Sequence, residues 1–117
     1  MATVLVIDDE KIVRDVITQR LHQEGHQVLS YADAAPALEA VDFADIDLIL
    51  MDLMMPTPGE RAITTLRHRG DATPILVLTG KSGAGEHLLS MGANRVLAKP
   101  FRLMGLLTNM EQLLPAN

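Results

Sequence analysis

The 117-residue sequence has no cysteine, no excess of basic residues and no long hydrophobic run. Without cysteine it has neither a disulfide framework nor thiolate ligands for a metal, so nothing in it favours an oxidising compartment. Ten Lys and Arg residues against 15 Asp and Glu residues give a net charge of −5, the wrong sign for a nucleic-acid binder. No apolar run approaches the roughly 18 residues of a membrane span, and Met1–Thr3 offers no basic start of a secretion signal. These absences predict a cytoplasmic domain that touches neither membrane nor nucleic acid directly.

The length of 117 residues suits one domain with its own core. A chain of this size removes about two-thirds of its unfolded surface from water when it folds. The sequence contains no linker, no low-complexity tract and no repeat. We therefore expect a single domain over residues 1–117.

Short apolar blocks alternate with segments of helical periodicity along the whole chain. The blocks are typical of strands, and they lie at Thr3–Asp8, Gln27–Tyr31, Ile46–Asp52, Pro74–Thr79 and Arg95–Ala98. The segments between them predict five helices: Glu10–Glu24 ending at Gly25, a short helix with Asp33 as candidate N-cap, a helix through Ala62 and Leu66 to Gly70, one around Glu86–Met91, and Phe101–Leu114. Apolar side chains on one stripe of the first helix are expected to face the core, namely Ile12, Val13, Val16, Ile17 and Leu21. Parallel neighbours need right-handed crossovers, so this alternation predicts a doubly wound α/β fold.

Polar residues stand where four of the predicted strands end. They are Asp8, Asp9, Asp52, Thr79 and Lys99. In open parallel sheets the ligand binds beyond the carboxyl ends of the strands, at the point where the strand order reverses. We therefore expect these five side chains to form one site.

The chemistry of the five side chains is complementary. Three carboxylates close together repel one another unless a cation joins them. Oxygen ligands without cysteine favour Mg²⁺, with Mn²⁺ as the alternative. Lys99 offers a positive charge to an anionic oxygen and Thr79 a hydroxyl donor to another, an arrangement that favours phosphoryl transfer to a carboxylate. Asp52 is the best candidate nucleophile, since its central strand places it between the acidic pair and the Thr/Lys side.

Four motifs make the sequence similar to a known family. They are Asp8-Asp9-Glu10, Asp52-Leu53-Met54-Met55-Pro56, Thr79-Gly80 and Lys99-Pro100-Phe101, each at the end of a predicted strand. In this order and spacing the chain resembles the receiver domains of bacterial two-component response regulators, of the chemotaxis-regulator type. The resemblance covers essentially the whole chain.

The resemblance implies a flavodoxin-like sheet of five parallel strands in the order 2-1-3-4-5 with five helices. It implies that Asp52 is the phospho-acceptor and that Mg²⁺ is held by Asp8, Asp9, Asp52 and the backbone carbonyl of Met54. Thr79 and Lys99 would contact the phosphoryl oxygens. A histidine kinase or a histidine phosphotransfer protein would donate the phosphoryl group, and a downstream effector protein or domain would respond. Such a domain assists its own phosphorylation and dephosphorylation, and is a switch more than an enzyme.

The sequence departs from the family pattern at three places. The span from Thr79 to Lys99 is about two residues short of the family's usual span. The glycine that follows the Met-Pro pair comes one residue early, at Gly59, and Val96 stands where the family often has an aromatic ring that rotates on activation. A β-branched side chain has few rotamers to exchange. We therefore expect the glycine-containing segment Gly80–Gly92 to carry the signal by ordering or shifting.

Three other functions fit parts of the pattern. A magnesium-dependent phosphatase with an aspartyl nucleophile typically has a second Asp two residues later, where this chain has Met54. A flavodoxin-like cofactor binder needs a Ser/Thr/Gly-rich loop after the first strand, where Asp8-Asp9-Glu10 would repel a phosphate. A receiver-like scaffold that has lost phosphorylation would not be expected to keep all five site residues.

Overall fold

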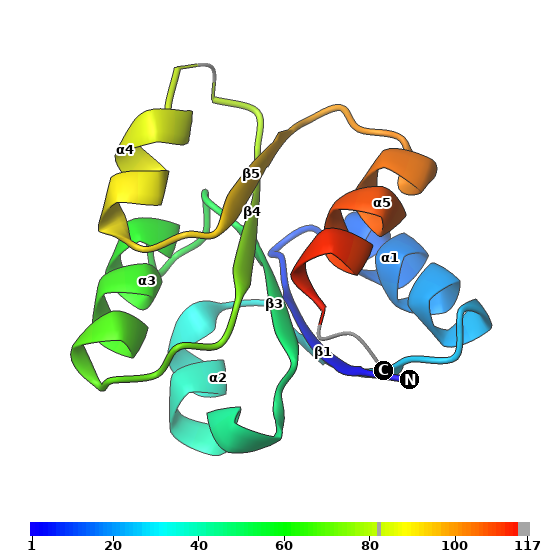
Figure 1. The fold of residues 1–117 in the computed structure, drawn as a ribbon, viewed down its shortest axis with the longest axis horizontal. Helices are drawn as coiled ribbons and strands as arrows, with labels where there is room; N and C mark the ends of the chain where they lie inside the picture. Colours follow the sequence, from blue (N-terminus) through cyan, green and yellow to red (C-terminus); the bar gives the residue numbers. More distant parts are fainter. Residues whose placement is uncertain (82, 115–117) are drawn as a thin grey trace.

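Five parallel strands form one sheet in the order β2-β1-β3-β4-β5, in a computed structural model that describes residues 1–81 and 83–114 (Figure 1). The elements in chain order are β1 Thr3–Ile7, α1 Lys11–Gln23, β2 Gln27–Tyr31, α2 Ala34–Ala40, a 3₁₀ turn Phe43–Asp45, β3 Leu48–Asp52, α3 Gly59–His68, β4 Ile75–Thr79, α4 Gly85–Met91, β5 Arg95–Ala98 and α5 Leu103–Leu113. The predicted doubly wound fold, its strand order and its five helices are confirmed.

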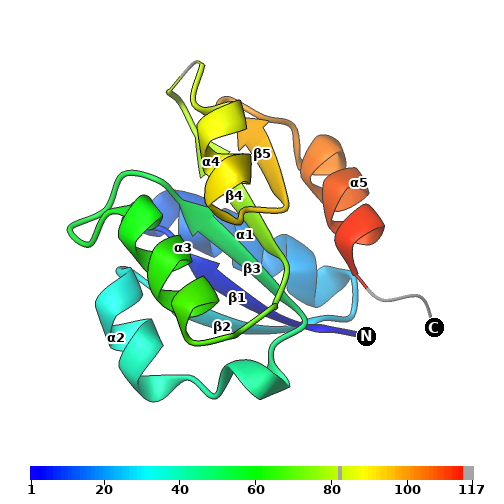
Figure 2. The same cartoon turned by 60° about the vertical axis from the view of Figure 1, so that its left-hand side comes forward.

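Helices cover both faces of the sheet. Helices α1 and α5 lie on one face, and α2, α3 and α4 lie on the other (Figures 1 and 2). Two hydrophobic cores result, one under each layer. Every residue of β3 and β4 is buried, whereas the edge strand β2 is partly exposed. This explains why the central strands are continuous apolar runs instead of alternating patterns.

Most element boundaries fall within one or two residues of the prediction, and two differences have a local cause. Strand β3 begins at Leu48 and not at Ile46, because a 3₁₀ turn at Phe43–Asp45 precedes it. The carboxylate of Asp42 accepts from the backbone N–H of Ala44 at 3.1 Å and holds that turn. Helix α5 begins at Leu103 instead of Phe101, since Arg102 before it is extended.

The first helix ends as predicted but buries a narrower stripe. Gly25 adopts a φ of +88°, and its N–H donates to His22 O while the N–H of His26 donates to Leu21 O, which together satisfy the last carbonyls of α1. Ile17 is buried with Leu21. The expectation that the whole apolar stripe faces the core is wrong.

Two side chains of that stripe remain at the surface. Ile12 is 80% exposed and Val16 is 46% exposed. Both line a groove between α1 and the connection from β5 to α5, together with Phe101 and Leu103. Periodicity alone did not distinguish this surface groove from the core.

Candidate functional site

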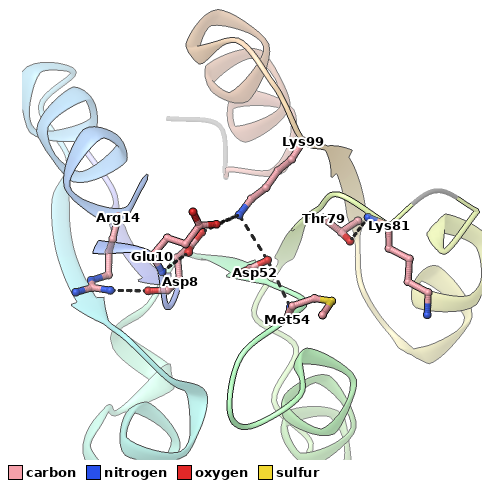
Figure 3. Close-up of polar contacts among 8 residues, drawn as sticks. All are labelled: Asp8, Glu10, Arg14, Asp52, Met54, Thr79, Lys81 and Lys99. Carbon is pink, nitrogen blue, oxygen red and sulfur yellow. Dashed lines mark hydrogen bonds and ion pairs between the residues drawn. The ribbon is translucent and has the colours of Figure 1, made fainter. Parts of the chain in front are cut away.

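Four carboxylates meet at the carboxyl edge of the sheet. Asp8 follows β1 and Asp52 ends β3, so neighbouring strands place them side by side (Figure 3). Both are buried, whereas Asp9 and Glu10 are exposed. One oxygen from each of the four residues lies within 4.8 Å of the others.

Lys99 extends from the end of β5 into this acidic group. Its ammonium nitrogen lies 3.2 Å from Asp8 Oδ2, 3.6 Å from Asp52 Oδ1 and 3.7 Å from Glu10 Oε1. Only 20% of its side chain is exposed. Burial disfavours the charged amine, but the hydrogen bond to Asp8 and the charges of Asp52 and Glu10 outweigh it and raise the pKa of Lys99. The lysine therefore stays positively charged at neutral pH.

The environment of Asp52 disfavours its charge. Burial raises the pKa of the Asp52 carboxyl; Lys99 opposes that rise, and the charges of Asp8 and Asp9 add to it. The backbone N–H of Met54 lies 3.5 Å from Asp52 Oδ1. A carboxylate in this position gains from any further positive charge nearby.

The backbone around Asp8 is held from two directions. The guanidinium of Arg14, on α1, donates to the carbonyl oxygen of Asp8 at 2.6 Å. The N–H of Glu10 donates to Asp8 Oδ1 at 2.9 Å. These contacts fix the turn that carries Asp9 and Glu10, and Asp8 Oδ2 pairs with Lys99.

Thr79 lies at the end of β4, on the far side of Asp52 from Asp8 (Figure 3). It is buried, and its hydroxyl accepts a hydrogen bond from the N–H of Lys81 at 3.0 Å. Met54 is 70% exposed in the connection after β3. The acidic groove at this end of the sheet has a volume of about 540 Å³ and is lined by Asp9, Glu10, Asp52, Met54, Gly80, Lys81 and Lys99.

The structure brings together four of the five side chains expected to form one site: Asp8, Asp9, Asp52 and Lys99. Thr79 borders this group, and its hydroxyl faces the turn at Lys81. Glu10 belongs to the cluster but was not among the predicted site residues. The signal for it was present in the sequence, because it is the third acid in the run after the first strand.

The residues present fit a divalent cation. Four carboxylates face one lysine, so the group carries an excess of negative charge. Their donors are all oxygens, which are the ligands that Mg²⁺ prefers. An acidic groove and a partly buried lysine at the switch point of an open parallel sheet define a domain that can hold a divalent cation next to an anionic oxygen group.

Comparisons with known proteins agree with that class. Residues 4–111 match the family model of the response regulator receiver domain. The chain is 38% identical over 114 residues to the response regulator MprA of Mycobacterium ulcerans (strain Agy99), covering 95% of this chain and 49% of MprA. It is 33% identical over 111 residues to the regulatory protein VanR of Enterococcus faecium, covering 92% of this chain and 48% of VanR. The chain thus spans about half the length of these curated relatives.

Solved structures give the same result. The chemotaxis response regulator CheY4 of Vibrio cholerae superposes with a TM-score of 0.89 at 31% identity, covering 97% of this chain and 99% of that one. The response regulator TrrA of Thermotoga maritima, solved in complex with Mg²⁺ and BeF, gives a TM-score of 0.85 at 27% identity, with 97% and 100% covered.

The chain belongs to the response regulator receiver domain family. Receiver domains are the phosphorylation switches of two-component signal transduction, and this is the function of the chain. Members of the family work between a kinase and an effector and bind Mg²⁺ at an acidic pocket. Among residues 1–81 and 83–114, none of the helices is long and apolar enough to cross a membrane.

Proposed function

We propose that Asp52 is the residue that accepts the phosphoryl group. The observation that carries this assignment is its position: it is a buried carboxylate at the end of a central strand, 3.6 Å from the ammonium of Lys99 and open to the acidic groove. A carboxylate oxygen of Asp52 attacks the phosphorus of a phosphohistidine. The P–N bond breaks, the imidazole leaves, and an acyl phosphate remains on Asp52.

The acidic group binds Mg²⁺ in this proposal. Asp8, Asp9 and Asp52 supply carboxylate oxygens, the backbone carbonyl of Met54 supplies another ligand, and Glu10 adds negative charge at the rim. When bound, the ion supplies positive charge against the oxygens of the transferred group. Mn²⁺ offers the same preference for oxygen ligands.

Lys99 and Thr79 take different parts in the same reaction. The ammonium of Lys99 is already held over the groove by three carboxylates and stabilises phosphoryl oxygens by charge. Thr79 offers a neutral hydroxyl, whose bond to the N–H of Lys81 links it to the segment after β4. Phosphorylation changes the partners of that hydroxyl and so reaches the segment that leads to α4.

The surface beside the site offers an apolar groove to a phosphodonor partner. The groove between α1 and the β5–α5 connection holds about 520 Å³, and its lining includes the exposed side chains of Ile12 and Val16. Glu10 and Lys99 line its end nearest the acidic group. A histidine kinase or phosphotransfer protein that packs apolar side chains here brings its phosphohistidine next to Asp52.

We assign residues 1–117 to one receiver unit that is a switch and not a turnover enzyme. Met54 stands at the position where an aspartyl phosphatase would need a second acid, and its side chain is apolar. The unit assists its own phosphorylation and dephosphorylation, and passes its state to a downstream effector protein or domain.

Intact-mass measurement after treatment with acetyl phosphate and Mg²⁺ tests the assignment. We expect one added phosphoryl group on the wild type and none on Asp52→Asn. Asp45→Asn is the matched control, because Asp45 is an exposed carboxylate in the 3₁₀ turn before β3. Phosphorylation of Asp52→Asn at the wild-type level would show that another residue is the acceptor. Steady release of phosphate from small phosphate esters would favour the phosphatase instead.

A further inference from the structure

The connection between β3 and α3, residues 53–58, is closed tightly at its base. The N–H of Gly59 donates to Leu53 O at 2.9 Å. A Cβ on Gly59 would lie 3.0 Å from the Cα of Leu53 and 3.1 Å from the carbonyl oxygen of Asp52, closer than real Cβ atoms normally approach backbone. The chain therefore leaves Asp52, passes through the loop and comes back into contact with the backbone of Asp52 at Gly59. Met54 lies in the first half of this loop.

Asp33 binds the returning side of this loop, at Thr57. The N–H and the hydroxyl of Thr57 donate to the two carboxylate oxygens of Asp33, each at 2.8 Å. Asp33 lies 24 residues earlier in the chain, between β2 and α2. Asp33 is the N-cap residue of α2, as the sequence predicts, and its two carboxylate oxygens accept from Thr57 of the neighbouring loop.

The pairing uses every donor that this part of the loop offers. Thr57 stands between Pro56 and Pro58, which have no backbone N–H, so its own N–H is the only main-chain donor of residues 56–58. Partial burial disfavours the charge of Asp33, but the two hydrogen bonds from Thr57, together with smaller contributions from the backbone N–H groups of Ala34 and Ala35, outweigh it and lower the pKa of Asp33. The bonds are therefore charge-assisted at neutral pH, the stronger kind.

Met54 lies three residues before Thr57, and proline fixes φ at position 56 in between. A displacement of Thr57 is thus carried through this short segment to Met54, whose backbone carbonyl is a ligand of Mg²⁺ in the proposed function. We propose that Asp33, outside the acidic group, is a positioning residue that sets the Mg²⁺ affinity of the site through Thr57. This inference rests on the proposed function, because it assumes that the Met54 carbonyl is a metal ligand.

The Mg²⁺ dissociation constant, measured by isothermal titration calorimetry on the full chain, is the readout. Partners that orient metal ligands directly are worth about 10–100-fold in affinity. Asp33 acts through Thr57, which lies three residues from Met54, so we expect Asp33→Ala to weaken Mg²⁺ binding by about 10-fold, the lower end of that range. Thr57→Val keeps the backbone donor and loses the hydroxyl, so its effect should be smaller, and Thr57→Ser should bind as the wild type does.

Asp71 provides the matched control. Its carboxylate accepts from the N–H and the hydroxyl of Thr73 at 2.8 and 2.6 Å, the same kind of pair, in the connection before β4 at the opposite edge of the sheet. Asp71→Ala should lower the melting temperature as Asp33→Ala does, and leave the Mg²⁺ dissociation constant within twofold of the wild type. A purely structural role of Asp33 would make the two variants alike in both measurements.

Each outcome decides the proposal. Unchanged Mg²⁺ affinity in Asp33→Ala, or equal weakening in Asp71→Ala, overturns it while the metal site stands. If Asp33→Ala does not fold, Thr57→Val and Thr57→Ser decide, and equal affinities in both overturn it. A wild type that binds no Mg²⁺ overturns the proposed metal site together with this inference, and Asp9→Ala distinguishes the cases, since it should lose Mg²⁺ binding even where Asp33 has no effect.

Discussion

Replacing Asp52 with asparagine should stabilise the protein when no divalent cation is present. The substitution removes one of four negative charges that share the groove and keeps an oxygen that accepts from the N–H of Met54. Binding sites often hold like charges close together, which costs stability. Removing one of these functional residues is therefore expected to stabilise the fold.

The magnitude follows from the charges that face Asp52. Asp8 is also buried, and at a separation of up to 4.8 Å the two repel by about 3.5 kcal/mol at an effective dielectric constant of about 20. Lys99 at 3.6 Å attracts Asp52 by about 4.6 kcal/mol on the same scale. The exposed Asp9 and Glu10 each add about 1 kcal/mol of repulsion in water-like surroundings. The repulsion by the three carboxylates and the attraction by Lys99 nearly cancel. Asparagine also avoids the cost of burying a charged group, so we expect the free energy of unfolding of the variant to be higher by about 1–2 kcal/mol.

Thermal unfolding followed by circular dichroism measures this difference. For a domain of this size, 1–2 kcal/mol corresponds to roughly 4–8 °C in melting temperature. We expect Asp52→Asn to melt higher than the wild type by that amount in EDTA. Mg²⁺ at ten times its dissociation constant adds about 1.4 kcal/mol to the wild type, so the gap should close when the ion is added.

The control is Asp45→Asn, which changes the net charge by the same amount away from the site and should leave the melting temperature almost unchanged. Equal stabilisation by both variants would assign the effect to the overall charge of −5. A lower melting temperature for Asp52→Asn in EDTA, or a gap that ignores Mg²⁺, would refute the idea that the carboxylates repel one another in the free protein.

Three further predictions follow from single contacts. Lys99→Ala should reduce phosphorylation by acetyl phosphate strongly, whereas Thr79→Ala should still be phosphorylated but transmit poorly to an effector, because only the lysine supplies a full charge; equal mild effects would remove Lys99 from the site. Val96→Ala should leave signalling nearly intact, and amide exchange should change most across residues 80–92 on phosphorylation; the opposite pair of results would place the switch on β5. Gly59→Ala should lower the free energy of unfolding by about 1–3 kcal/mol in a denaturant titration, because its Cβ meets backbone that cannot move aside.

The fold was predictable because its signals are local and repeated. Each apolar block predicted a strand. The polar residues that end these blocks were predicted to lie together, because the carboxyl ends of parallel strands share one edge of the sheet. The errors occurred where one pattern fits two environments. Ile12 and Val16 have helical spacing like Ile17, but α5 covers only part of that side of α1. The 3₁₀ turn before β3 is short, and the buried Ile46 after it resembles the start of a strand.

The candidate site was predictable as far as it consists of strand ends. Asp8, Asp52 and Lys99 converge because parallel strands bring their carboxyl ends to one edge. The contact between Asp33 and Thr57 was not predictable, because it joins two loops 24 residues apart and an aspartate before a helix already has a local explanation as an N-cap. Contacts between loops depend on the three-dimensional path of each connection, which periodicity does not describe.

The two ends of α4 are held unequally, and this bears on how the phosphorylated state is transmitted. At the C-terminal end, Arg67 on α3 donates to Gly92 O at 2.9 and 3.1 Å and to Asn94 Oδ1 at 3.0 Å, while Asn94 accepts from the N–H of Ile75. The N-terminal end follows Gly83, and Ala84 at its N-cap has no side chain that could accept a hydrogen bond. The firmly bonded end is therefore the one away from the acidic groove, and the weakly held end begins a few residues after Thr79. A change at the groove meets the least resistance in the first turn of α4, and this is where we expect the displacement to be largest.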